Sequence, residues 1–140
     1  MNLQISETRD IAACRALRRV VFIEEQGVSE ADEIDSEDEA AIHLLAKLDG
    51  AEVGSARLLL RGDHAKIGRV CVLSAARGHG IGAALIRAAV ARLRLVEGVG
   101  SVKLGAQTHA LGFYQALGFE AYGAEYQDAG IAHRDMILRF

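Results

Sequence analysis

The 140-residue chain contains no proline and no tryptophan, and it has only two cysteines. Cys14 and Cys71 both lie in apolar-patterned segments, which favours buried thiols in a reducing compartment over a disulfide framework. No apolar run approaches the ~20 residues that a membrane-spanning helix needs. The first residues have neither the basic start nor the long apolar stretch of a signal peptide. We therefore expect a cytoplasmic protein without membrane attachment.

Positive charge is missing from one stretch of the chain. Between Glu24 and Glu39 lie nine acidic residues and no Lys or Arg, although the net charge of the whole chain is only −3. This balance argues against nucleic acid as the main partner. A charge run is usually a solvated face, and attraction of a cationic ligand is the alternative interpretation.

Closely spaced metal ligands are also missing. The five histidines include no H-x-x-x-H pair, and the two cysteines form no C-x-x-C pair. Zinc sites are commonly built from such pairs. We therefore expect no metal.

Hydrophobic periodicity predicts one α/β domain over residues 1–140, with a mixed sheet rather than a doubly wound one. Helical spacing predicts helices over Ile11–Phe22, Ile81–Val96 and Ala110–Leu117. Thr8 or Asp10 can cap the first of these. The acidic stretch reads as a loop with a short helix. Strands are predicted at Leu3–Ile5, Ile42–Leu48, Val53–Leu60, Lys66–Leu73, Val102–Ala106, Phe119–Tyr122 and Ile131–Leu138.

The most informative motif is Arg77-Gly78-His79-Gly80-Ile81-Gly82, which opens the second predicted helix. Glycine permits positive φ, so successive backbone N–H groups can converge on one point. The following helix adds unpaired first-turn N–H groups and the positive end of its dipole. The motif therefore predicts a phosphate-binding loop.

Two nucleotide-binding families have similar loops. A Walker loop needs Lys and Ser or Thr after its last glycine, and neither follows Gly82. In the dinucleotide fingerprint G-x-G-x-x-G the third glycine comes one residue later than here. Both alternatives are therefore disfavoured.

Three features together resemble the GCN5-related N-acetyltransferase (GNAT) superfamily. They are Ile67-Gly68-Arg69-Val70-Cys71-Val72 running into the glycine loop, the motif Tyr114-x-x-Leu117-Gly118-Phe119, and the order of strands along the chain. The resemblance implies a mixed, mostly antiparallel sheet flanked by helices, with two splayed strands that form an acetyl-CoA cleft. Relatives often form homodimers.

The chain is most similar to the ElaA- or YjcF-like branch of that superfamily. The residues that carry this similarity are Val21-Phe22-Ile23-Glu24-Glu25-Gln26, Asp35-x-x-Asp38 before His43, Ala106-Gln107, and Gly130-Ile131-x-His133-x-x-Met136.

The resemblance implies acetyl-CoA as donor and an amine as acceptor. Backbone groups of Gly78, His79, Gly80, Ile81 and Gly82 would hold the pyrophosphate, with charge added by Arg77. The main chain of Val70, Cys71 and Val72 would pair with the pantetheine arm as an added strand. In a strand, Cys71 points away from the side chains of its two neighbours, so we expect direct transfer rather than an acetyl-cysteine.

Catalysis needs an acid for the departing sulfur and a base for the acceptor amine. Tyr114 is the acid that the resemblance implies. Candidates for the base are Glu25, Asp35, His43, His109 and His133, or a water. The preferred acceptor-side group is Glu25, Gln26 and His43, with Gln107 and His133 behind them.

The sequence thus predicts a small-molecule N-acetyltransferase. A non-catalytic acyl-CoA sensor and a protein or peptide N-acetyltransferase are the alternatives. Turnover with small amines separates them, because a sensor binds without turnover and a protein acetyltransferase prefers peptides.

Overall fold

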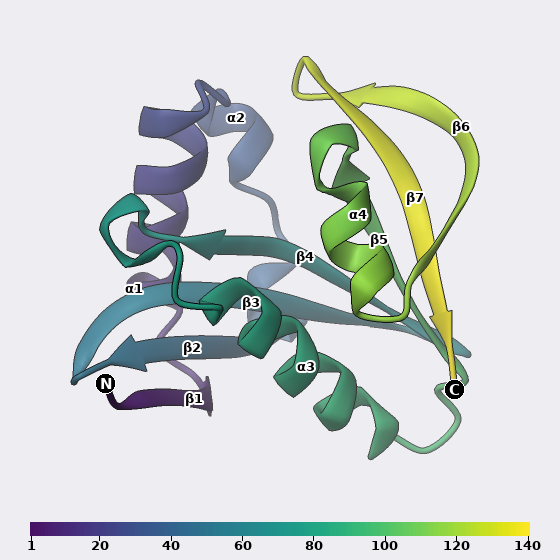
Figure 1. Cartoon of the computed structure of the whole chain (residues 1–140), viewed down its shortest axis with the longest axis horizontal. Coiled ribbons are helices and arrows are strands. Elements are labelled where there is room, and N and C mark those ends of the chain that lie inside the picture. The colour runs from purple at the N-terminus through teal and green to yellow at the C-terminus, as the bar shows by residue number, and fades with distance from the viewer.

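The computed structural model describes residues 1–140 as one seven-stranded sheet with helices on both faces (Figure 1). The sheet order is β1-β2-β3-β4-β5-β7-β6, and only the β4–β5 pair is parallel. The strands are β1 Leu3–Thr8, β2 Ile42–Leu48, β3 Ala51–Arg61, β4 His64–Val72, β5 Ser101–Gln107, β6 Glu120–Asp128 and β7 Ile131–Arg139. The predicted mixed, mostly antiparallel sheet is confirmed.

The helices are short apart from one. They are α1 Ile11–Arg18, the π-helix η1 Arg19–Glu25, α2 Glu30–Glu33, α3 Ile81–Arg94 and α4 Leu111–Ala116, with single 3-10 turns at η2 Asp38–Ala40, η3 Ser74–Ala76 and η4 Thr108–Ala110. None is long and apolar enough to cross a bilayer. Of the two residues predicted to cap the first helix, Asp10 caps α1: its carboxylate accepts a hydrogen bond from the N–H of Ala13 at 3.1 Å.

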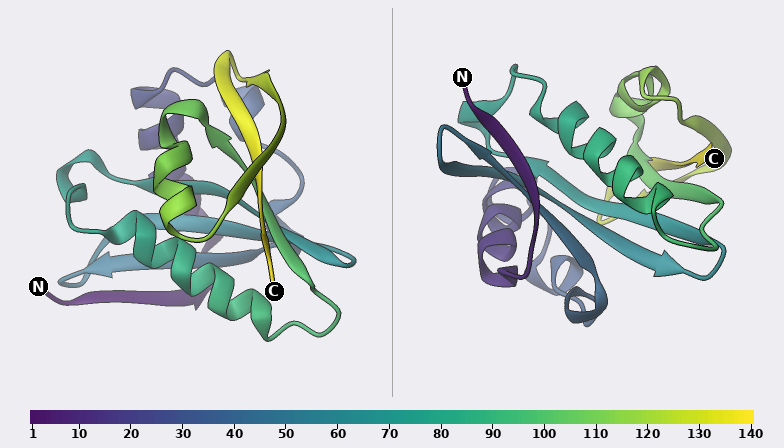
Figure 2. Two further views of the ribbon diagram at one scale, coloured as in Figure 1. Left: turned by 45° about the vertical axis from the view of Figure 1, so that its right-hand side comes forward. Right: turned by 90° about the horizontal axis from the view of Figure 1, so that it is seen from below.

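The core forms because α3 places one apolar stripe on the sheet. Leu85, Ala89 and Leu93 follow at four-residue spacing and are fully buried, together with Ile86. Burial of each leucine side chain stabilises the fold by about 1.5–3 kcal/mol. The opposite face of the sheet is covered by α1 and α2 (Figure 2).

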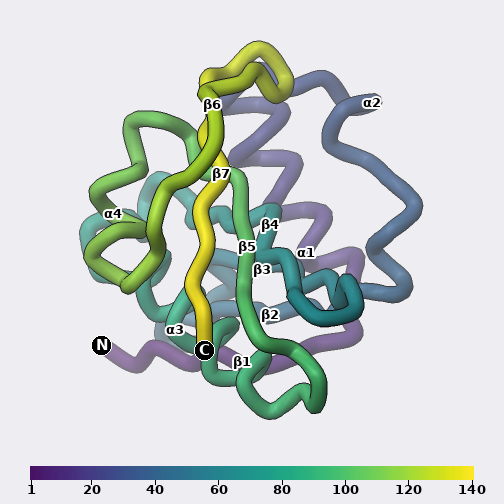
Figure 3. The backbone as a smooth tube through the Cα atoms, turned by 90° about the vertical axis from the view of Figure 1, so that its right-hand side faces the viewer, coloured from purple at the N-terminus to yellow at the C-terminus, as the bar shows by residue number.

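Strands β4 and β5 separate soon after they begin. Their register holds only at His64–Ser101, Ala65–Val102 and Lys66–Lys103, and the strands then diverge (Figures 1 and 3). A bulge in β4 accompanies the divergence, with Arg69 at φ 51°. Bulges bend a strand and increase its twist. The predicted pair of splayed strands is therefore present.

Two elements differ from their predicted form. The first helix continues beyond Arg18 as a π-helix to Glu25, in which the N–H of Gln26 donates to the carbonyl of Val21. Such wide turns are frequent at functional sites. The strand predicted over Phe119–Tyr122 runs on to Asp128, after a break in its pairing with β7.

Candidate functional site

The glycine loop lies between η3 and α3 and leaves a row of backbone donors free. None of the backbone hydrogen bonds of the chain uses the N–H groups of residues 78–83. Gly80 makes this possible, because it is the cap of α3 at φ 73°, in the left-handed region that favours glycine. Six consecutive donors at the positive end of a 14-residue helix form a binding site for an anion.

A cavity of about 740 Å³, here called the loop cavity, runs from this loop along β4. Val70, Cys71 and Val72 line it, together with Gly78, Gly80 and Gly82. His79 is exposed and does not line it. The cavity therefore joins the anion-binding loop to the splayed part of β4.

The backbone of Val72 points into the loop cavity. The N–H of Leu73 donates to the carbonyl of Val53 on β3, and backbone groups of successive strand residues point to opposite edges. Both backbone groups of Val72 therefore face the gap between β4 and β5, and the side chain of Arg77 donates to its carbonyl at 3.1 Å. Apart from this bond to the carbonyl, the edge is open, and the N–H of Val72 is available to pair with an extended ligand.

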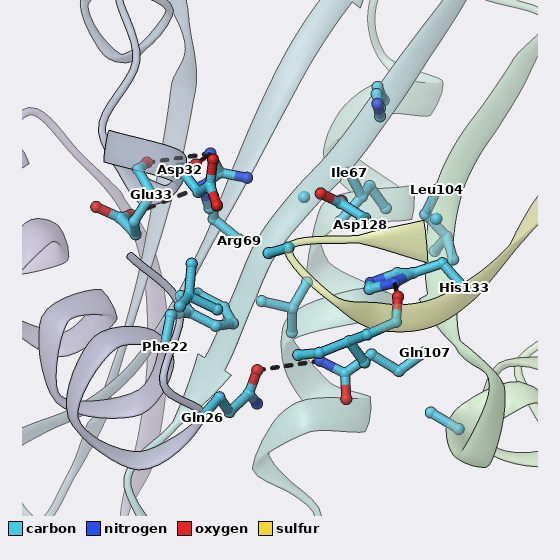
Figure 4. Close-up of a pocket in the computed structure, with 18 of the residues that line it drawn as sticks. Phe22, Gln26, Asp32, Glu33, Ile67, Arg69, Leu104, Gln107, Asp128 and His133 are labelled. Atoms are coloured by element: carbon cyan, nitrogen blue, oxygen red, sulfur yellow. Dashed lines mark hydrogen bonds and ion pairs between the residues drawn. The ribbon is translucent and has the colours of Figure 1, made fainter. Parts of the chain in front are cut away.

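A second cavity of about 300 Å³, here called the inner cavity, lies in the gap between β4 and β5. In Figure 4, Phe22 and Gln26 of the η1 segment approach it from one side and Gln107 and His133 from the other. The amide of Gln107 donates to that of Gln26 at 3.1 Å across the gap. The π-helix η1 carries Phe22 and ends directly before Gln26, and it thereby places both residues beside the inner cavity.

The two cavities meet at four residues that line both. These are Gln26, Val70, Gln107 and Ile131. They come from four elements that are far apart in the sequence. A group at this junction is reachable from both cavities.

Tyr114 lines the inner cavity from α4. Its ring makes edge contacts with Phe113 and Phe119, at centroid distances of 5.0 and 6.1 Å. Burial raises the pKa of the Tyr114 hydroxyl, so the phenol keeps its proton at neutral pH. It can therefore act as a proton donor.

Known proteins share both the sequence pattern and the fold. The family model for the acetyltransferase (GNAT) domain matches residues 18–140. The chain belongs to the GNAT acetyltransferase family. YjcF of Bacillus subtilis, named as an uncharacterized N-acetyltransferase, is 31% identical over 122 residues, covering 86% of each protein.

Two crystal structures overlay on nearly the whole chain. An acyl-CoA N-acyltransferase from Pseudomonas aeruginosa is 31% identical, with a TM-score of 0.86 and 98% coverage of both chains. Escherichia coli ElaA is 28% identical, with a TM-score of 0.85 and 99% coverage of both. The resemblance to the ElaA- and YjcF-like branch is confirmed, and the protein is an acyltransferase of a family that uses acetyl-CoA.

In this GNAT acetyltransferase the two buried acids of the acidic stretch belong to an ion-pair network, whereas five of its nine acids are exposed, as expected of a solvated face. Asp38 is 1% exposed and accepts hydrogen bonds from Arg18 at 2.9 and 3.0 Å, and from Arg15 and Arg57. Glu33 binds Arg18, which is also 1% exposed. These arginines belong to α1 and β3, so the network ties the segment to the sheet.

Two further acids of the stretch are paired at less buried positions. Asp35 binds Arg57 and Arg69, and Glu37 binds Arg61. The hydrogen bond from Arg57 lowers the pKa of Asp35. An acid held in this way is a weak base, and it does not line the inner cavity.

The acceptor-side group predicted for the acetyltransferase is only partly assembled. Gln26, Gln107 and His133 line the inner cavity. Glu25 lines the loop cavity instead and forms a bidentate ion pair with Arg77. The hydrogen bond from Arg77 lowers the pKa of Glu25.

His43 is not brought to either cavity, which corrects the predicted grouping. It is 3% exposed on β2, and its Nε2 donates to the carbonyl of Asp38 at 2.7 Å. His109 lines only the loop cavity, with its Nε2 2.7 Å from the Gln107 oxygen.

Cys71 is 3% exposed and packs with Leu17, Val21 and Leu45 beneath α1. Burial raises the pKa of its thiol, which disfavours the thiolate that nucleophilic attack requires. No three His, Cys, Asp or Glu side chains gather as a metal site would require.

Proposed function

We propose that the protein transfers an acetyl group from acetyl-CoA directly to a primary amine of a small molecule. The observation that carries the proposal is the junction of the two cavities at Gln26, Val70, Gln107 and Ile131. One cavity begins at an anion-binding loop, and the other is about 300 Å³, the size of a pocket for a small ligand.

The donor fits the loop cavity by its chemistry. The N–H groups of residues 78–83 would bind the pyrophosphate of CoA, and Arg77 would add positive charge. The amide-containing pantetheine arm would pair with the free edge of Val70, Cys71 and Val72 in the manner of an added strand. Bound acetyl-CoA supplies an activated thioester.

The charge of the inner cavity suits a cationic acceptor. Three carboxylates line it, from Asp32, Glu33 and Asp128, against two cations, Lys66 and Arg69. Alkylamines carry a proton at neutral pH, because their pKa is near 10.4. Gln26 and Gln107 would offer hydrogen bonds at the junction. Glu33 is already paired with Arg18 and Arg69, so Asp32 and Asp128 are the carboxylates that would attract an ammonium group.

The reaction requires two proton movements besides the acyl transfer. The neutral amine attacks the thioester carbonyl carbon, and the C–S bond breaks as the intermediate collapses. The N–H of Val72, which faces the gap, would donate to the developing oxyanion. The acceptor nitrogen loses one proton before it attacks and a second one from the intermediate. Tyr114 gives its own proton to the departing sulfur and takes up this second proton from the nitrogen.

The test is release of free thiol from acetyl-CoA by the purified protein with a panel of small primary amines, amino sugars, polyamines and lysine peptides. We expect turnover with at least one small amine and a lower kcat/KM for the peptides. Binding of acetyl-CoA, measured by calorimetry, without turnover of any amine would support the sensor instead. Preference for peptides would support a protein acetyltransferase.

A further inference from the structure

We propose that His133 is the general base that deprotonates the acceptor amine, acting through its Nε2. This inference rests on the proposed function and names the residue that carries its first proton transfer. His133 lies on β7 and lines the inner cavity. In Figure 4 its ring projects from β7 toward the middle of the cavity, across from Phe22.

The hydrogen bonding of the ring fixes where its proton lies. Nδ1 is 2.7 Å from the carbonyl oxygen of Ile131. A carbonyl oxygen can only accept, so Nδ1 must carry the hydrogen. Nε2 of the neutral ring therefore has the lone pair, and no group of the chain donates to it. A histidine in this tautomer is ready to accept a proton from a ligand.

The ring is also held from its face. Tyr126 of β6 stacks on His133 at a centroid distance of 5.9 Å and an interplanar angle of 23°. The Tyr126 hydroxyl donates to Asp135 at 2.7 Å. A Cβ on Gly105 would collide with that hydroxyl, so glycine leaves room for Tyr126 in this position. Tyr126, Asp135 and Gly105 are positioning residues for the base.

The other candidate bases are engaged elsewhere. Glu25 is bound to Arg77 and Asp35 to two arginines. His43 lies outside both cavities. Among the histidines, only His133 lines the inner cavity.

The surroundings of His133 include charged and titratable groups from four elements. These are Asp32 and Glu33 of α2, Lys66 and Arg69 of β4, Tyr114 of α4, and Tyr126 and Asp128 of β6. Because the pKa of an alkylamine is near 10.4, the acceptor enters as ammonium and must lose a proton inside the cavity. That first proton goes to Nε2 and then to solvent. The second is the one that restores Tyr114.

The experiment compares wild type with His133→Gln, using an amine that wild type acetylates, from pH 6 to 10. We expect kcat at pH 7 to fall about 100-fold or more, with less than a threefold change in the KM for acetyl-CoA. The deficit shrinks toward pH 10, because solvent then deprotonates the amine (pKa about 10.4). Added imidazole restores part of the activity of His133→Ala.

His64→Gln is the matched control. This histidine lies at the start of β4, is bonded to Asp63, and lines neither cavity. It should keep the wild-type pH profile. A deficit of His133→Gln that is equal at every pH, without imidazole rescue, overturns the assignment while wild-type turnover upholds the proposed function. Wild type that acetylates no amine overturns both.

Discussion

Replacement of Asp38 by alanine tests the idea that the acidic segment is held by a buried ion-pair network. The Asp38 carboxylate accepts hydrogen bonds from Arg18 at 2.9 and 3.0 Å, Arg15 at 3.0 Å and Arg57 at 3.2 Å. Its removal leaves Arg18, which is 1% exposed, with Glu33 as its remaining partner. Removal of one partner from a buried ion pair typically destabilises a protein by about 3–5 kcal/mol.

The measurement is urea unfolding, followed by circular dichroism and extrapolated to water. Asp38→Ala should lower the free energy of unfolding by about 3–5 kcal/mol. The matched control is Glu30→Ala, because Glu30 pairs with Arg19 at 3.2 Å where both side chains are more than half exposed. An exposed pair contributes about 0–1 kcal/mol. If Asp38→Ala lost no more than this control, the reasoning would be refuted.

The pH dependence gives an independent check on Asp38. Burial alone would raise the pKa of its carboxyl, but hydrogen bonds from Arg18 and Arg15 outweigh this and hold the pKa well below its usual range. The unfolded chain, with an aspartate pKa near 3.9, then binds more protons than the native state. The stabilisation is therefore present above about pH 4 and is lost on further acidification. The gap between wild type and Asp38→Ala should narrow from pH 5 to pH 2.

Two further variants test the donor side. Tyr114→Phe keeps the ring contacts with Phe113 and Phe119 and should lower kcat about 100-fold at unchanged thermal stability; Tyr122→Phe, on exposed β6, is the control, and an intact kcat would contradict the acid role. Gly80→Ala strains a residue at φ 73° by about 1–2 kcal/mol, so the KM for acetyl-CoA should rise about tenfold. Gly62→Ala, at φ 72° in the β3–β4 turn, should lower stability without moving that KM.

Local signals in the sequence were sufficient for most elements and for the donor side. The stripe of Leu85, Ala89 and Leu93 identified α3, and the glycine spacing identified the loop at its start. Both depend on neighbours within a few residues, which periodicity and backbone chemistry can describe. The motif around Tyr114 likewise identified α4 and a residue of the inner cavity.

The ion-pair network could not be found in this way, because its partners are far apart in the chain. Arg18 lies seven residues after Ile11, on the apolar stripe of the first helix. The chain has 13 arginines and three lysines, and arginine is the usual cation of buried ion pairs. These two signals, together with a stretch of nine acids that contains no Lys or Arg, could have indicated an internal network.

The location of His43 and His133 depends on long-range packing. Both were base candidates, yet one is buried beside Asp38 and the other faces the inner cavity. The sequence around each contains nothing that distinguishes them. Only the sheet register and the route of the acidic segment separate their roles.

The gap between β4 and β5 also leaves the two halves of the sheet joined by a short seam. Strands β1 to β4 form one unit and β5, β7 and β6 the other, with only three register pairs along their shared edge. Hydrogen-bonded amides exchange with solvent only through local openings, whereas an amide that faces this gap without a partner, like that of Val72, exchanges without one. A ligand that pairs with this edge bonds that amide, and so binding is expected to slow its exchange from the fast, unprotected rate.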